Sequence, residues 1–402
     1  MARVTRAVAV ALGMAAWCPI HLSAQDEQDA RPRHQPGYHA LNVGVDGVGL
    51  SIGNSRRWTG LRINFQDNAV ERVNGFNFTI WDAKHNETME LNGLAVGIAG
   101  PVGGRFTGAT IGVVGAVAEQ GFRGLTLAGV GAVSNGDMRG VSIAGLGVVS
   151  EGDMDGINIS GLGTVADRSM RGLNVAGLGV VANRDMLGIN VSGLGTVADG
   201  RMTGINLGGL AVVGNRSVGG LSAGGLAIVS NGAVTGVSVG GLAVVGNGTA
   251  RGITAAGLAV VSDGAVEGVS AAGLAVVGNG RVRGITAAGL AVVTNGTMTG
   301  LSVAGLAVVG NQGLRGVAIG GVHVEGRWIE GLAVSPIRTR TWDLTGVSVA
   351  GYNRIKGEQH GLTIGLYNYA RQLHGVQFGL INNARNNHGL FRVLPLINLH
   401  LD

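Results

Sequence analysis

Residues Gly236–Arg251 read GVSVGGLAVVGNGTAR, and copies of this sixteen-residue unit follow one another on both sides of it. Its first glycine recurs every sixteen residues from Gly124 to Gly316, which gives twelve consecutive copies. When that glycine is numbered 0, the copies share aliphatic residues at position 1, glycine at 5, valine at 9 and, in all but the first copy, leucine at 6. A fixed period of this kind predicts a repeat architecture in which each copy packs against its neighbours.

The apolar residues alternate over short runs and are rich in valine and isoleucine, which predicts β-strands. The alternation slips at the position 5 glycine, where we expect a corner. Asn-Gly and Asp-Gly pairs near position 11 predict a turn, because both residues tolerate positive φ. The constant leucine and valine indicate that every copy is buried alike. The leading glycines that we expect to be structural are Gly140, Gly156, Gly172, Gly188, Gly204, Gly236, Gly252, Gly268, Gly284 and Gly300.

Two all-β architectures fit this unit. We favour a tandem-repeat β-solenoid with capping ends, in which each copy is one coil and identical residues form ladders along the stack. The alternative is an up-and-down outer-membrane β-barrel, in which each copy supplies one strand of about ten residues and a turn. Positions 10 and 15 alternate between odd and even copies, as Gly246 and Ser262 and as Arg251 and Glu267 show. A meander would produce this alternation, and so would duplication of a two-coil unit.

The chain divides into five parts by composition and period. Residues 1–24 have a basic start, an apolar stretch and the small residues Ser23 and Ala24, which predicts a signal peptide. Residues 25–37 are polar and predict a flexible tail. Residues 38–123 contain irregular capping repeats, 124–316 the regular copies, and 317–402 irregular copies, two fourteen-residue copies and a closing strand.

The last copies, GLTIGLYNYARQLH (Gly361–His374) and GVQFGLINNARNNH (Gly375–His388), follow a pattern G-Φ-x-[IF]-G-L-x-N that GLSIGN (Gly49–Asn54) shares. With the signal peptide and the proline-containing terminal strand, this pattern resembles the surface repeat-containing proteins known from Leptospira and found in other Gram-negative bacteria. The resemblance is specific over residues 361–402. It implies an exported, envelope-associated protein.

The sequence holds no phosphate-binding loop, zinc-protease motif or paired CxxC, and we expect neither enzymatic activity nor a cofactor. The only cysteine, Cys18, lies in the predicted signal peptide. The net charge is +5 and the arginines are scattered, so we expect no nucleic-acid partner. His360, His374 and His388 each precede a repeat glycine, and stacking would place them in one row. Such a row could bind a metal, but solvated turn histidines are the simpler interpretation.

Buried asparagines are expected to bond one another along the stack. They are Asn158, Asn174, Asn190, Asn206, Asn368 and Asn382. Together these patterns predict a non-enzymatic, exported envelope or cell-surface repeat protein with a structural or adhesive role. Its partner would be a surface ligand or envelope component, and outer-membrane association would be compatible with it.

Overall fold

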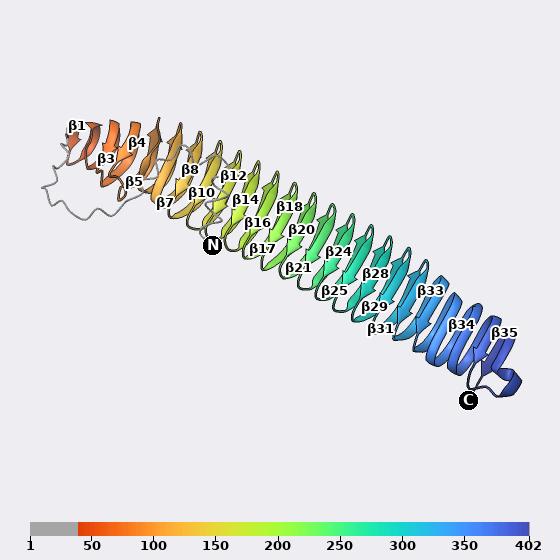
Figure 1. Ribbon diagram of the computed structural model, residues 1–402. Coiled ribbons are helices and arrows are strands. Elements are labelled where there is room, and N and C mark those ends of the chain that lie inside the picture. Colours follow the sequence, from red (N-terminus) through yellow and green to blue (C-terminus); the bar gives the residue numbers. More distant parts are fainter. Residues whose placement is uncertain (1–38, 402) are drawn as a thin grey trace, which may run out of the picture. The chain divides into compact units, whose positions relative to one another are not determined.

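The computed structural model describes residues 39–401, and these form β-strands and a single 3₁₀ turn (Figure 1). The predicted signal peptide (1–24) and tail (25–37) lie outside the described residues. The described residues form two compact units, 39–193 and 194–401, and each is described by itself. No helix within residues 39–401 is long and apolar enough to cross a membrane.

The strands of the first unit are spaced with the period of the repeat glycines. They are β1 (Ala40–Val45), β2 (Val48–Gly53), β3 (Arg57–Asn68), β4 (Arg72–Lys84), β5 (Glu90–Gly97), β6 (Val102–Gly112), β7 (Gly115–Ala128), β8 (Gly131–Ser134), β9 (Asp137–Ala144), β10 (Gly147–Ser150), β11 (Met154–Ser160), β12 (Gly163–Ala166), β13 (Met170–Ala176), β14 (Gly179–Ala182) and β15 (Met186–Ser192).

The second unit continues the same alternation of long and short strands. Its strands are β16 (Gly195–Ala198), β17 (Arg201–Gly208), β18 (Ala211–Gly214), β19 (Ser217–Gly224), β20 (Ala227–Ser230), β21 (Ala233–Gly240), β22 (Ala243–Gly246), β23 (Ala250–Ala256), β24 (Ala259–Ser262), β25 (Val266–Ala272), β26 (Ala275–Gly278), β27 (Val282–Ala288), β28 (Ala291–Thr294), β29 (Thr297–Ala304), β30 (Ala307–Gly310), β31 (Gly313–Gly320), β32 (His323–Gly326), β33 (Trp328–Thr341), β34 (Asp343–Ala384) and β35 (Val393–His400), with the 3₁₀ turn η2 at Gly389–Arg392.

Each copy is one coil of a parallel β-solenoid, as predicted. In the first unit β9, β11 and β13 pair in parallel, with Gly140 opposite Gly156 and Gly156 opposite Gly172. In the second unit β21, β23 and β25 pair in the same way, with Gly236 opposite Gly252. This register joins residues sixteen apart and runs parallel, so the up-and-down barrel alternative is wrong. Antiparallel pairing occurs at the ends of the described chain, in β1 with β2 and in β34 with β35.

The leading glycines hold the backbone in a conformation that other residues rarely adopt. Their φ angles in the regular copies are positive, for example +121° at Gly156 and +110° at Gly252. A Cβ added at Gly252 would lie 2.2 Å from the carbonyl oxygen of Gly236 in the coil before. The chain bends at the Asn-Gly and Asp-Gly pairs, as predicted, for example at Asn247-Gly248 and Asp263-Gly264. The glycines of these two bends do not have positive φ.

The coil interior differs from the prediction that leucine and valine at positions 6 and 9 are buried. In the copy Gly236–Arg251, Leu242 lies in the corner and is exposed, while Val245 is half-buried on the outer face. The buried side chains come from positions 2, 4, 8, 10 and 14, where Ser238 and Val244 are examples. Residues at 1 and 3 alternate with them and therefore face outward. The interior holds valine, methionine, alanine and polar residues, and the leucines of position 6 lie outside it.

The predicted asparagine ladders are present inside both units. Asn158 donates to Asn174 and Asn174 donates to Asn190, each at 2.9 Å, and all three are buried. Asn368 donates to Asn382 at 2.7 Å. Stacked amides satisfy one another along the axis, so polar residues inside the coil carry little of the usual cost of burial.

Replacing Asn174 with alanine is expected to destabilise the protein by about 2–3 kcal/mol, because it leaves the Asn158 amide and the Asn190 carbonyl without their ladder partner. Asn183→Ala is the matched control. It removes an exposed ladder bond of 3.1 Å to Asp167 and is expected to cost less than about 0.5 kcal/mol. Urea denaturation measures both, and equal losses would contradict the buried ladder.

The alternation between odd and even copies also has a structural basis. At position 15, Arg251 bonds Glu267 of the next coil at 2.8 Å, so alternating charge keeps like charges apart in one ladder. Arg315 bonds Glu330 at 2.6 Å, and this hydrogen bond raises the pKa of Arg315. At position 10, Ser262 donates to the carbonyl of Gly248 in the preceding turn at 2.6 Å. The parallel register of residues sixteen apart excludes a meander as the cause of this alternation.

Candidate functional site

The predicted histidine row forms in part. The rings of His360 and His374 stack, with centroids 4.8 Å apart and an interplanar angle of 9°. His388 does not continue this stack but directly precedes η2. His400 on β35 takes its place, with its ring 6.1 Å from that of His374 in an edge-on arrangement. The antiparallel pairing of β35 with β34, which places His400 opposite Gly375, brings this residue in.

The surroundings of these rings include a carboxylate that the sequence reasoning missed. Glu358 lies 3.2 Å from Nε2 of His360, two residues along the same strand. His400 Nδ1 lies 2.5 Å from the Asn387 side-chain oxygen. Among residues 39–401 no group of three or more His, Cys, Asp or Glu side chains is arranged to hold a metal ion. The cluster is a surface stack of histidines with polar neighbours.

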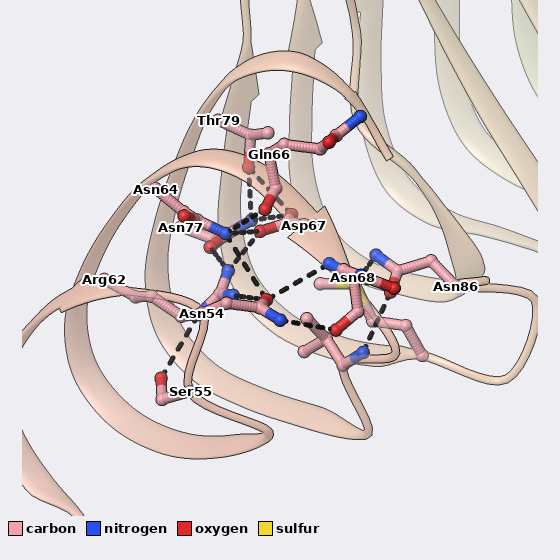
Figure 2. Close-up of polar contacts among 12 residues, drawn as sticks. Asn54, Ser55, Arg62, Asn64, Gln66, Asp67, Asn68, Asn77, Thr79 and Asn86 are labelled. Atoms are coloured by element: carbon pink, nitrogen blue, oxygen red, sulfur yellow. Dashed lines mark hydrogen bonds and ion pairs between the residues drawn. The ribbon is translucent and has the colours of Figure 1, made fainter. Parts of the chain in front are cut away.

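A buried polar network lies in the first coils of the first unit and was not predicted (Figure 2). Arg62 is fully buried and forms an ion pair with Asp67, which is also buried. The Arg62 guanidinium donates to Asn77 at 2.7 Å and to Asn54 at 3.0 Å. The Asp67 carboxylate also accepts from Thr79 at 2.7 Å. These side chains hold the adjacent strands β3 and β4 together. The role of the network is therefore structural.

A small polar pocket lies at the turn side of the second unit. It has a volume of about 230 Å³ and its lining residues are Asn311, Glu325, Gly326, Arg327, Arg340, Thr341, Trp342 and Lys356. The Lys356 ammonium lies 5.5 Å from the centre of the Trp342 ring, and Arg340 lies 3.6 Å from Glu325. Three cationic side chains against one carboxylate make the pocket net positive, which suits an anionic group.

The most extensive feature is a row of exposed leucines at position 6 of the second unit, which we call the leucine edge. The exposed fractions of these side chains lie between 44% and 47%, and the residues are Leu194, Leu210, Leu226, Leu242, Leu258, Leu274, Leu290 and Leu306. They occupy the bend between the long and the short strand of each coil. Two positions further on, the valine of the same coil is fully buried, as Val260 and Val292 show.

Aliphatic side chains continue on both sides of the leucine edge. Positions 1 and 3 supply exposed Ile253 and Val239 on one flank, and positions 7 and 9 supply alanine and valine on the other. Where position 3 is alanine, the first flank has a shallow apolar groove of about 450 Å³ between Val239 and Val303. A second apolar groove of about 620 Å³ lies at the corresponding positions of the last coils and includes Phe378 and Leu396.

Charged residues border this surface but do not reach its ridge, since exposed Arg251 at position 15 precedes exposed Ile253 by two residues in β23. From Gly204 to Arg315 the charged residues all lie at positions 11 to 15, and they are Arg216, Arg251, Asp263, Glu267, Arg281, Arg283 and Arg315. The coil is therefore amphipathic in cross-section, with an apolar bend at one end and a polar turn at the other. Sequence reasoning identified the leucines but assigned them to the interior, because an apolar residue constant in every copy is usually buried.

Comparison of the chain with protein-family models, with curated proteins and with solved structures gave no match. Function is therefore inferred from the geometry of the coils and from the sequence.

Proposed function

We propose that the protein is a non-enzymatic, exported repeat protein of the bacterial envelope or cell surface, with a structural or adhesive role towards a surface ligand or envelope component. The observation that carries the proposal is the regular repetition of exposed side chains along the surface of the coils. In the regular copies of the second unit leucine is exposed at the same position of each coil, so this unit presents a periodic surface suited to an extended partner rather than to one small substrate. The amino-terminal leader pattern supports export.

The charge pattern favours a partner other than nucleic acid. Arg139, Asp155 and Arg171 alternate along one ladder of the first unit, with Arg–Asp distances of 3.8 and 3.6 Å. Because positive and negative side chains alternate along this ladder, they do not form the clustered positive stripe on which nucleic-acid binding depends. An envelope component is the partner that agrees best with both the leader and the coil surface.

Fractionation of a Gram-negative host that expresses the full chain tests the proposal. We expect a processed form that begins at Gln25 and sediments with the envelope. Leu12→Arg, which breaks the apolar stretch of the leader, is the control and is expected to leave an unprocessed chain in the cytoplasm. An unprocessed wild-type chain that remains in the cytoplasm would contradict export.

A further inference from the structure

The leucine edge is unusual because the apolar surface wraps around a convex bend. Position 6 forms the ridge, positions 1 and 3 lie on one flank, and positions 7 and 9 lie on the other. A flat protein face could cover one flank at a time. A medium that flows around the ridge, such as the hydrocarbon of a lipid layer, covers all three surfaces together.

The backbone of the edge is already satisfied within the unit. The amide of each leucine donates to the carbonyl of the leucine one coil before, for example from Leu242 to Leu226 at 2.7 Å and from Leu258 to Leu242 at 2.8 Å. The corner glycine and the residue after the leucine also donate to the preceding coil, as Gly241 and Ala243 show. Polypeptide can enter hydrocarbon only when its backbone groups are bonded internally, and the donors of this bend meet that condition.

The dimensions and the charges fit a bilayer surface as well. Positions 3 and 9 lie three residues from the ridge, which corresponds to about 10 Å of extended chain. Peripheral apolar surfaces enter a bilayer to a depth of about 5–10 Å. The charged residues between Gly204 and Arg315 are five arginines and two acidic residues, a net charge of +3. They lie beyond the apolar flanks, where anionic headgroups would meet them.

We propose that the leucine edge of the second unit inserts into the surface of an anionic phospholipid bilayer. The aliphatic side chains of positions 3, 6 and 9 enter the acyl boundary, and the arginines at positions 12 to 15 face the headgroups. This inference rests on the proposed function, since it names a lipid layer as the envelope component that the protein contacts.

The test is flotation of the full chain with vesicles made of an equimolar mixture of phosphatidylethanolamine and phosphatidylglycerol. We expect the wild-type protein to float with the vesicles. L226E/L290E places two carboxylates on the ridge and is expected to lower the partition coefficient by at least about tenfold, because a charge is costly at the acyl boundary. The matched control is N231E/N295E, which adds the same charges to the same two coils at the exposed turns. It is expected to keep most of the binding.

Circular dichroism verifies that both variants retain the β-fold of the wild type. Failure of the folded wild-type chain to float would overturn the inference, as would equal losses in the two variants. A wild-type dimer in sedimentation that L226E/L290E dissociates, without vesicle binding, would overturn it in favour of a second copy. Export and lipid binding fail separately: a processed envelope protein that does not float refutes the lipid contact alone, and an unprocessed cytoplasmic protein that floats refutes the export alone.

Discussion

Replacing Gly252 with alanine is expected to destabilise the second unit by about 3 kcal/mol or more, which is large for the addition of one methyl group. Two causes act together. The residue has φ of +110°, where a side chain is strained, and the new Cβ would lie 2.2 Å from the carbonyl oxygen of Gly236. That oxygen belongs to the backbone of a coil packed on both sides, so it cannot move away without disturbing the ladder.

Gly195→Ala in the same unit is the matched control. This glycine is at position 7, where a Cβ would lie 4.0 Å from the nearest heavy atom, the Ala211 carbonyl oxygen. The next coil already has alanine at the same position, Ala211. We expect a change within about 0.5 kcal/mol. Urea unfolding followed by circular dichroism measures both, and a G252A variant as stable as G195A would contradict the stacking of leading glycines.

Replacing Arg62 with methionine is expected to cost about 3–5 kcal/mol, because it leaves the Asp67 carboxylate buried without its cationic partner. The loss includes the hydrogen bonds that the guanidinium donates to Asn54 and Asn77. Methionine is of similar length, so the change removes charge and hydrogen bonds more than it removes volume. Thermal unfolding of the full chain measures the effect.

Arg57→Met is the matched control in the same strand, β3. Arg57 donates to Glu71 at 2.6 Å in an exposed pair, and this hydrogen bond lowers the pKa of the Glu71 carboxyl group. Exposed pairs contribute little to stability, so we expect a much smaller loss than that of Arg62→Met. Equal effects of R57M and R62M would show that the buried network does not hold the first coils together.

The period of the glycines predicts most of the fold. Sixteen-residue spacing identifies the coil, and the two punctuation points at positions 5 and 11 mark its bends, because small residues and turn formers are required where the chain changes direction. The asparagine ladder was also predictable, since identical amides stacked in parallel can bond one another. These features repeat, and repetition makes them visible in one sequence.

The assignment of inside and outside could not be made in this way. Both alternating faces of the repeat are mainly apolar, so hydrophobicity does not distinguish them, and Ser238 at position 2 looks like a surface residue. The space inside the coil determines which residues face inward. The interior between the two strands of a coil accommodates valine, alanine and ladder-forming amides, while leucine occupies the open bend. The pair of Arg62 with Asp67 and the contact of His400 with His374 each occur once, so neither leaves a periodic signal in the sequence.

Thiol reactivity of Leu258→Cys and Val260→Cys, each in a chain with Cys18→Ser, tests the arrangement of the coil most directly. The two positions are two residues apart in one copy, and their side chains are 45% and 0% exposed. We predict that L258C reacts with a thiol reagent at close to the rate of the unfolded chain, and that V260C is protected until the protein unfolds. Protection of L258C together with rapid reaction of V260C would contradict the outward leucine edge and the lipid contact proposed for it.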